Sequence, residues 1–377
     1  MIYLDNAATT NVKPQRVIGA VTNALRFYSA NPGRSGHKAS LAAQEQIYLC
    51  RKKCAEMFGA KDEAAVIFTA NCTTSLNTVI KGVLKAGDHV VVSSLEHNSV
   101  MRPLEHLRRS GLIEYDVAEV VFGDAAATYR AFERQIKDNT KMIICTHASN
   151  VTGQIMPIEQ IGALCNAKNI LFCVDAAQTA GVLDIDMQKM HIDYLCVAPH
   201  KGLYAPMGTG LLIANKEINK TLIEGGTGSD SANMLQQPIT PEGFESGTVN
   251  LPGICGVAAG VDFVKTVTHK AIRQKEMKIA ALIYERLYSL KKIITYTSYP
   301  KISEYVPVIP FNIEGIASED AARYLDKNGV AVRAGLHCAP SAHKRLGTLD
   351  TGALRVSPSF FNSLHDADVL YKILRAV

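Results

Sequence analysis

The 377-residue sequence contains no uninterrupted apolar run of the roughly 18 residues that a membrane-spanning helix requires. Its first residues, MIYLDNAATT, lack the basic segment and the following apolar segment of a secretory signal. The chain also contains no internal repeat, low-complexity tract or proline-rich linker. We therefore expect a globular protein that stays in the cytoplasm and has no membrane partner.

Concentrated charge and metal-type cysteine spacing are absent too. The 40 basic and 35 acidic residues are scattered, and short basic runs such as 51–53 are typical of solvated helix faces, so we expect no nucleic-acid partner. The closest cysteine pair, Cys50 and Cys54, lies on a helical pattern without the second pair that a zinc site needs, which predicts no metal. An odd number of cysteines, nine in all, favours reduced thiols over disulfides.

The pattern of apolar runs predicts an α/β fold. Runs rich in β-branched residues alternate with helix-length amphipathic segments, as in a mostly parallel sheet covered on both faces. The predicted strands are Ala65–Phe68, His89–Ser93, Met142–Thr146, Leu171–Val174, Tyr194–Val197 and Gly210–Ala214. The length is sufficient for two domains.

A Gly-rich segment at 225–231 breaks this pattern, and a long helical stretch follows at 254–292. We predict an N-terminal segment at 1–14 that packs with the small domain, a large domain at 15–260 and a small α+β C-terminal domain at 261–377. In the small domain we expect strands at Tyr305–Phe311 and Ala331–Arg333 and a helix from Ser318 to Lys327.

Chemically capable side chains follow five of the predicted strands almost at once. Because ligands of open α/β sheets bind at the carboxyl ends of the strands, these residues are expected to line one crevice. In chain order they are Thr73, His97, Asn150, Asp175, Gln178, His200 and Lys201.

Lys201 and Asp175 together indicate a pyridoxal-phosphate (PLP) site. Lys201 follows an apolar run, where partial burial favours a lysine that forms Schiff bases, although a surface lysine in a loop fits equally well. Asp175 ends an apolar strand and needs a cationic partner, which a protonated pyridine nitrogen supplies. A helix N-cap is the simpler explanation of Asp175 alone. The pair is what a PLP enzyme requires.

Two further residues are candidates for substrate chemistry. Cys338 lies in the polar segment RAGLHCAP and is predicted to be an exposed loop thiol. The nearby Arg333 and His337 are expected to lower the pKa of this thiol. An ordinary loop thiol is the alternative. Arg355 lies between apolar residues and needs a bidentate acidic partner, either a substrate carboxylate or an acidic residue of the chain itself.

The sequence resembles the class V aminotransferase superfamily of fold-type I PLP enzymes, and within it the cysteine desulfurases. Nine motifs occur in the order and spacing of that family. They are YLDNAATT at 3–10, NPGRSGH at 31–37, the strand end at Thr69 with Thr73, EHNS at 96–99, HASNVTG at 147–153, DAAQ at 175–178, HKG at 200–202, FESGT at 244–248 and RAGLHCA at 333–339.

The resemblance implies roles for individual residues. Lys201 holds PLP covalently and is catalytic, Asp175 pairs with the pyridine nitrogen, and His97 stacks on the ring and is catalytic. Gln178 and Asn150 form hydrogen bonds with the ring oxygen and on the side of the ring where the substrate binds. The phosphate is held by Thr73, the backbone of Cys72, His200 and Thr248 of a neighbouring subunit, which implies a homodimer. Ala198 stands where relatives usually have a phosphate-binding serine, and Ala70-Asn71-Cys72 replaces a glycine-rich loop.

For the substrate, the resemblance implies that Arg355 binds the α-carboxylate and that Cys338 attacks the sulfur of PLP-bound cysteine and becomes a persulfide. The form R-x-G-x-H-C-A resembles the group with a short, ordered catalytic loop, which includes SufS-like desulfurases and selenocysteine lyases. The expected substrate is L-cysteine or L-selenocysteine, and the sequence identifies no sulfur acceptor. A PLP enzyme of another reaction type and a non-catalytic scaffold remain alternatives.

Overall fold

The computed structural model describes residues 1–33, 36–228 and 232–377. Positions 34–35 of the NPGRSGH motif and positions 229–231 of the Gly-rich segment lie outside the described residues.

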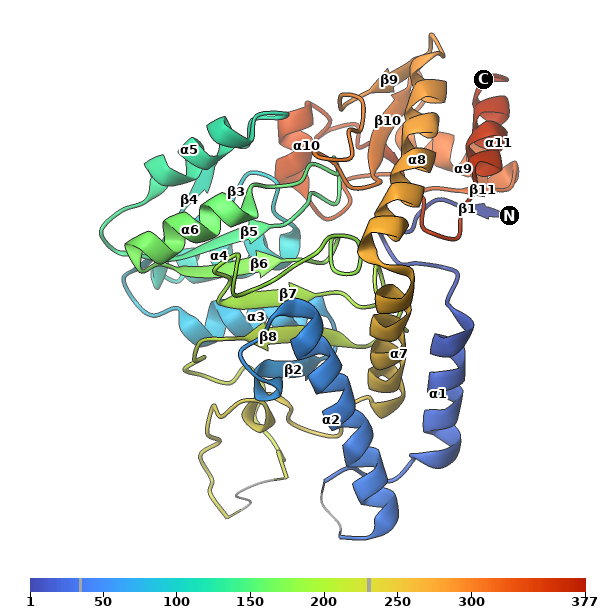
Figure 1. Ribbon diagram of the computed structural model, residues 1–377. Coiled ribbons are helices and arrows are strands. Elements are labelled where there is room, and N and C mark those ends of the chain that lie inside the picture. Colours follow the sequence, from blue (N-terminus) through green and yellow to red (C-terminus); the bar gives the residue numbers. More distant parts are fainter. Residues whose placement is uncertain (34–35, 229–231) are drawn as a thin grey trace.

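A seven-stranded sheet forms the centre of the molecule (Figure 1), with the strand order β2-β8-β7-β6-β5-β3-β4. Neighbouring strands from β7 to β4 pair in parallel, whereas β8 is antiparallel to both of its neighbours. The strands are β2 (Val66–Thr69), β3 (Asp88–Ser93), β4 (Ile113–Ala118), β5 (Thr140–Thr146), β6 (Leu171–Asp175), β7 (Tyr194–Val197) and β8 (Gly210–Ala214). The predicted fold class is confirmed.

The central strands are mostly apolar because both faces of the sheet are buried. Along β5, Ile143 and Cys145 belong to one core cluster, and Met142 and Ile144 belong to the other, as the two-residue period of a strand requires. Helices α2 (Lys38–Phe58), α5 (Ala125–Gln135), α6 (Ile158–Lys168) and α7 (Leu251–Val267) cover the first face, and α3 (Cys72–Val83) and α4 (Asn98–Arg109) cover the second. Helix α1 (Gln15–Phe27) packs against α7.

Strand β4 was not among the predicted strands. It lies at the edge of the sheet and pairs with β3, so its middle side chains are partly exposed and Glu114 is exposed. Its sequence, IEYDVA, therefore lacks the continuous apolar character that marks the inner strands.

The C-terminal part forms a smaller layer with its own core, built on the antiparallel sheet β12-β10-β9. Its elements are α8 (His269–Tyr288), β9 (Ile293–Thr295), β10 (Ile309–Ile313), α9 (Ser318–Lys327), β11 (Val330–Ala331), α10 (Pro340–Leu346), β12 (Leu354–Val356) and α11 (Leu364–Leu374). The predicted helix at 318–327 is confirmed, and the strand predicted from Tyr305 begins four residues later, at Ile309. Short 3-10 turns occur at Glu63–Ala65 and Glu242–Phe244.

The long helical stretch predicted at 254–292 is two helices, because the chain turns at Thr268, whose φ is 78°. In the described part of the chain, no single helix is long and apolar enough to cross a membrane; α7 and α8 meet that criterion only as a pair, and the pair is bent by 81°.

The N-terminal segment belongs with the C-terminal layer. Strand β1 (Ile2–Tyr3) pairs in parallel with β11, and Asp5 pairs with Ser357 beyond β12. Both chain ends therefore lie on the same side of the molecule (Figure 1). The domain boundary between 260 and 261 stays a prediction.

Candidate active site

A cavity of about 210 Å³ opens where β5, β6 and β7 end. Its walls contain every residue predicted for the site with the exception of Thr248, namely Cys72, Thr73, His97, Asn150, Asp175, Gln178, His200, Lys201, Cys338 and Arg355. Residues from both parts of the chain thus face one small volume, and their individual roles stay predictions.

Lys201 is a partly buried lysine of the cavity wall, and the alternative of a surface loop lysine is wrong. Burial is the main cause that lowers its pKa, whereas the negative charge of Asp175 acts in the opposite direction. A lowered pKa increases the fraction of neutral amine at neutral pH, which is the form that attacks a carbonyl.

Asp175 is the last residue of β6 and is buried. Its Oδ1 accepts a hydrogen bond from the backbone N–H of Ala177 at 2.9 Å and one from the thiol of Cys72 at 3.7 Å. A turn follows it, not a helix, so the N-cap alternative is wrong. A buried carboxylate at a cavity wall is a suitable partner for a cationic ring nitrogen.

Another part of the cavity wall is suited to an anion. Helix α3 begins at Cys72, so the N–H groups of its first turn lie beside the hydroxyl of Thr73. His200 contributes a buried Nδ1 that has no hydrogen-bond partner in the described residues. Ala198 also lines the cavity and offers no hydroxyl group.

His97 caps α4 and is electrically neutral. Its Nδ1 accepts a hydrogen bond from the backbone N–H of Ser99 at 3.1 Å, which places the proton of the neutral ring on Nε2. Burial is the largest cause that lowers its pKa, and the charge of Asp175 opposes it. The ring is therefore a neutral group with one N–H available.

Cys338 is the exposed cysteine of this chain, as predicted, and its loop is anchored on both sides. Its carbonyl accepts a hydrogen bond from the backbone N–H of Asn98 at 2.7 Å, and the carbonyl of His337 accepts one from Asn150 Nδ2 at 2.7 Å. Both loop residues have left-handed backbone angles, with φ of 50° at His337 and 56° at Cys338. Such angles persist where surrounding contacts impose them.

His337 does not supply the positive charge that we expected beside Cys338. It is buried, its Nδ1 lies 3.1 Å from Nε2 of His343, and His343 Nδ1 lies 2.8 Å from the Thr348 hydroxyl. Burial first, and then the charge of Arg355, lowers the pKa of His337 to about 2. His337 is thus uncharged at neutral pH, and Arg333 is the remaining cation of this loop in the cavity wall.

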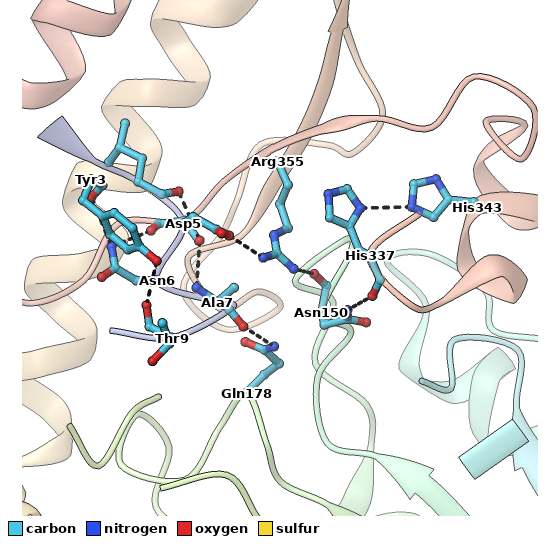
Figure 2. Close-up of polar contacts among 12 residues, drawn as sticks. Tyr3, Asp5, Asn6, Ala7, Thr9, Asn150, Gln178, His337, His343 and Arg355 are labelled. Atoms are coloured by element: carbon cyan, nitrogen blue, oxygen red, sulfur yellow. Dashed lines mark hydrogen bonds and ion pairs between the residues drawn. The ribbon is translucent and has the colours of Figure 1, made fainter. Parts of the chain in front are cut away.

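Arg355 is 2% exposed and is paired within the chain (Figure 2). Its Nη2 donates to Asp5 Oδ1 at 2.7 Å, and its Nη1 donates to the carbonyl of Asn150 at 2.9 Å. An ion pair with an acidic residue of the chain, one of the two alternatives, is therefore present. Its Nε is buried and unpaired among the described residues, so the guanidinium still has a donor to offer.

The N-terminal segment supports three walls of the cavity at once. Besides the bond from Asp5 to Arg355, the carbonyl of Ala7 accepts a hydrogen bond from Gln178 Nε2 at 3.0 Å (Figure 2). The carbonyl of His200, next to Lys201, accepts hydrogen bonds from the side chains of Thr9, Thr10 and Lys13. Sequence reasoning matched this segment as a motif but assigned it no function in the site.

Thr248 lies elsewhere, in the wall of a separate cavity of about 410 Å³ beside α2. Its predicted contribution to the site of a neighbouring subunit stays a prediction. The segment is held by Glu245, whose carboxylate is paired with Arg51 of α2 and accepts from the N–H of Phe68 at 2.6 Å.

The chain belongs to the aminotransferase class-V family, whose family model matches residues 2–370. Enzymes of this family depend on PLP, so the predicted cofactor is confirmed. The residues described above fit that group. The unpaired His200 Nδ1 and the start of α3 would hold its phosphate, Asp175 would pair with its ring nitrogen, and Lys201 would bind its aldehyde.

Individual relatives are cysteine desulfurases by name. A "Probable cysteine desulfurase" of Pyrococcus abyssi is 33% identical over 99% of this chain and 93% of its own length, and one of Methanothermobacter thermautotrophicus is 30% identical over 100% and 94%. The apo structure of a cysteine desulfurase from Thermococcus onnurineus NA1 superimposes with a TM-score of 0.92 at 30% identity, covering 100% of this chain and 94% of that one. The predicted family is confirmed, whereas the SufS-like group stays a prediction.

We predict that Asp5→Asn lowers the free energy of unfolding by about 3 kcal/mol, because it leaves the buried Arg355 without its counter-ion. Urea unfolding at pH 7 measures the change. Asp320→Asn is the matched control, since the Asp320–Arg323 pair is exposed and contributes less than about 1 kcal/mol. Equal effects of the two substitutions would contradict the prediction.

Proposed function

We propose that this chain is a cysteine desulfurase, which releases L-alanine from L-cysteine and keeps the sulfur as a persulfide on Cys338. The observation that carries the proposal is the common cavity of Lys201, Asp175, Arg355 and an exposed, anchored thiol. A plain aminotransferase needs the first three of these residues and has no use for the thiol. The names of the relatives point to the same reaction.

In this proposal each end of the substrate meets a different residue. The α-carboxylate is attracted by Arg355, whose Nε is unpaired and whose charge is shielded from water. The amine of Lys201, with its lowered pKa, moves the proton of the α-carbon. PLP supplies the electron sink for this step. The neutral ring of His97 offers an N–H from the same cavity.

Sulfur transfer then depends on Cys338. A bond forms between Cys338 Sγ and the substrate sulfur, and the carbon–sulfur bond of the substrate breaks. The carbon that has lost its sulfur gains a proton, and the product leaves as alanine. The anchored carbonyls of His337 and Cys338 hold the loop at the cavity mouth, which agrees with the short, ordered loop of the SufS-like group. An external thiol or acceptor protein must remove the persulfide sulfur.

A homodimer is part of the proposal. Large apolar side chains are exposed on α1, on α2 and on the segment before Thr248. Figure 1 shows these three segments of the backbone in the lower part of the molecule. They include Phe27 (67% exposed), Leu41 (54%), Met234 (95%), Leu235 (76%) and Ile239 (64%). Large apolar side chains that are exposed at one end of a molecule favour a protein interface there. A partner seated there brings its own Thr248 segment to the surface of this chain.

We predict that borohydride reduction of the PLP-loaded protein fixes the cofactor to Lys201, because the reagent reduces an amine-bound aldehyde to a stable secondary amine. Peptide mapping by mass spectrometry locates the label. Lys13 is the matched control, since burial lowers its pKa to about 8 and it lies beside His200. A label on Lys13, or one that survives in Lys201→Ala, would overturn the assignment.

We predict that Cys338→Ser separates substrate binding from sulfur transfer. Addition of L-cysteine should still change the absorption spectrum of the bound cofactor, whereas sulfide release with a reductant present should fall at least about 100-fold, because the nucleophile is missing. Cys255→Ala, which removes a buried thiol of α7, is the control for thiol loss in general. Native sulfide release by Cys338→Ser would sink the proposed function. Selenide release retained from L-selenocysteine would identify Cys338 as the residue that the sulfur substrate specifically needs.

We predict a light-scattering mass of two 40.9 kDa chains. Thr248→Val should weaken PLP binding without changing that mass, because it removes a hydroxyl from the shared site and leaves the apolar surface intact. Thr248→Ser, which keeps the hydroxyl, should not weaken PLP binding. A mass of one chain together with full activity at the same dilution is the result that excludes the dimer.

A further inference from the structure

Ser99 joins two residues of the cavity that the sequence assigned to different tasks. It is the second residue of α4, is 7% exposed and lines the cavity. Its Oγ lies 2.7 Å from the hydroxyl of Thr73 and 2.8 Å from Nδ1 of His97. Thr73 belongs to the anion-binding wall and His97 to the ring-stacking position, so Ser99 bridges the two.

The direction of the hydrogen bonds follows from the histidine. The backbone N–H of Ser99 donates to His97 Nδ1, so this nitrogen carries the single lone pair of the neutral ring, and the Ser99 hydroxyl shares that lone pair as a second donor. With its own proton directed at His97, Ser99 Oγ accepts a hydrogen bond from the Thr73 hydroxyl. The result is a series of hydrogen bonds from Thr73 through Ser99 to His97, in which each hydroxyl donates one hydrogen bond.

We propose that Ser99 is a positioning residue that couples the filling of the anion-binding wall to the basicity of His97. The proposal rests on the proposed function, in which a phosphate occupies that wall. An acceptor oxygen there accepts a hydrogen bond from the Thr73 hydroxyl, and Thr73 Oγ1 then accepts a hydrogen bond from the Ser99 hydroxyl. His97 Nδ1 then keeps only its backbone donor, and the neutral form of the ring loses part of its stabilisation.

The consequence for His97 has a definite sign. A hydrogen bond donated to Nδ1 favours the neutral ring and lowers the pKa, so its loss raises the pKa. The charged groups that influence His97 are Asp175 on β6, Lys201 after β7, Arg102 on α4 and Arg333 after β11, and none of them changes when Ser99 is replaced. His97 thus becomes a better proton acceptor when the phosphate is seated.

The test compares wild type with Ser99→Ala and with the conservative Ser99→Thr, which keeps the hydroxyl. The measurement is the pH midpoint of His97 protonation by NMR of ¹⁵N-histidine-labelled protein, with the His97 signal assigned through His97→Gln. Proteins loaded with PLP and with pyridoxal, which lacks the phosphate, are compared. In the pyridoxal form, Ser99→Ala should raise the protonation constant of His97 about threefold to tenfold, as expected for one hydrogen bond. Ser99→Thr should leave it unchanged.

The coupling itself is measured by the difference between the two cofactors. The negative phosphate attracts a proton to His97 in every variant, so only the part of the difference that depends on Ser99 is informative. We expect the shift between pyridoxal and PLP to be smaller in Ser99→Ala than in wild type. Equal shifts in the two proteins, or a neutral His97 with its proton on Nδ1, would refute the inference. A wild type that releases no sulfide from L-cysteine would instead refute the proposed function.

Discussion

A guanidinium that is withdrawn from water needs a partner, and in this protein the partner of Arg355 is Asp5, 350 residues earlier in the chain. Breaking such a buried pair is costly, so the N-terminal segment is held against β12. That attachment has further effects, because the residues after Asp5 support Gln178 and the backbone beside Lys201. One ion pair thereby fixes the positions of cavity walls that belong to different layers of the fold.

The cavity owes its chemistry to the contrast between groups that are kept neutral and groups that keep their charge. Burial lowers the pKa of His97 and of His337, so both imidazoles are uncharged, while Arg355 stays cationic beside Asp5. Burial also lowers the pKa of Lys201, although Asp175 limits that effect. An amino acid that enters this volume therefore finds the guanidinium groups of Arg355 and Arg333 for its carboxylate and, in Lys201, an amine with a lowered pKa.

The sequence predicted the inner strands and the residues at their ends because burial on both faces leaves continuous apolar runs with abrupt polar ends. Edge strand β4 was missed because it lacks that signal. The partner of Arg355 could not be predicted, since nothing local in the sequence marks a contact over 350 positions. The expected positive charge on His337 is absent because this side chain is buried, and its burial depends on packing in three dimensions, including the contact with His343. Ser99 was matched only as part of the EHNS motif and received no role, although its place two residues after His97 was a usable signal.

Nine cysteines in a protein proposed to carry reactive sulfur raise the question of self-poisoning, since a persulfide exchanges with any thiol that it meets. Cys338 is exposed, Cys72 is partly covered, and the other seven are buried. Burial raises the pKa of several of these, including Cys145 and Cys165, so they stay protonated and poorly nucleophilic. Most of the other thiols are therefore kept from a persulfide by burial, whereas Cys338 lies at the surface, where an acceptor can reach it.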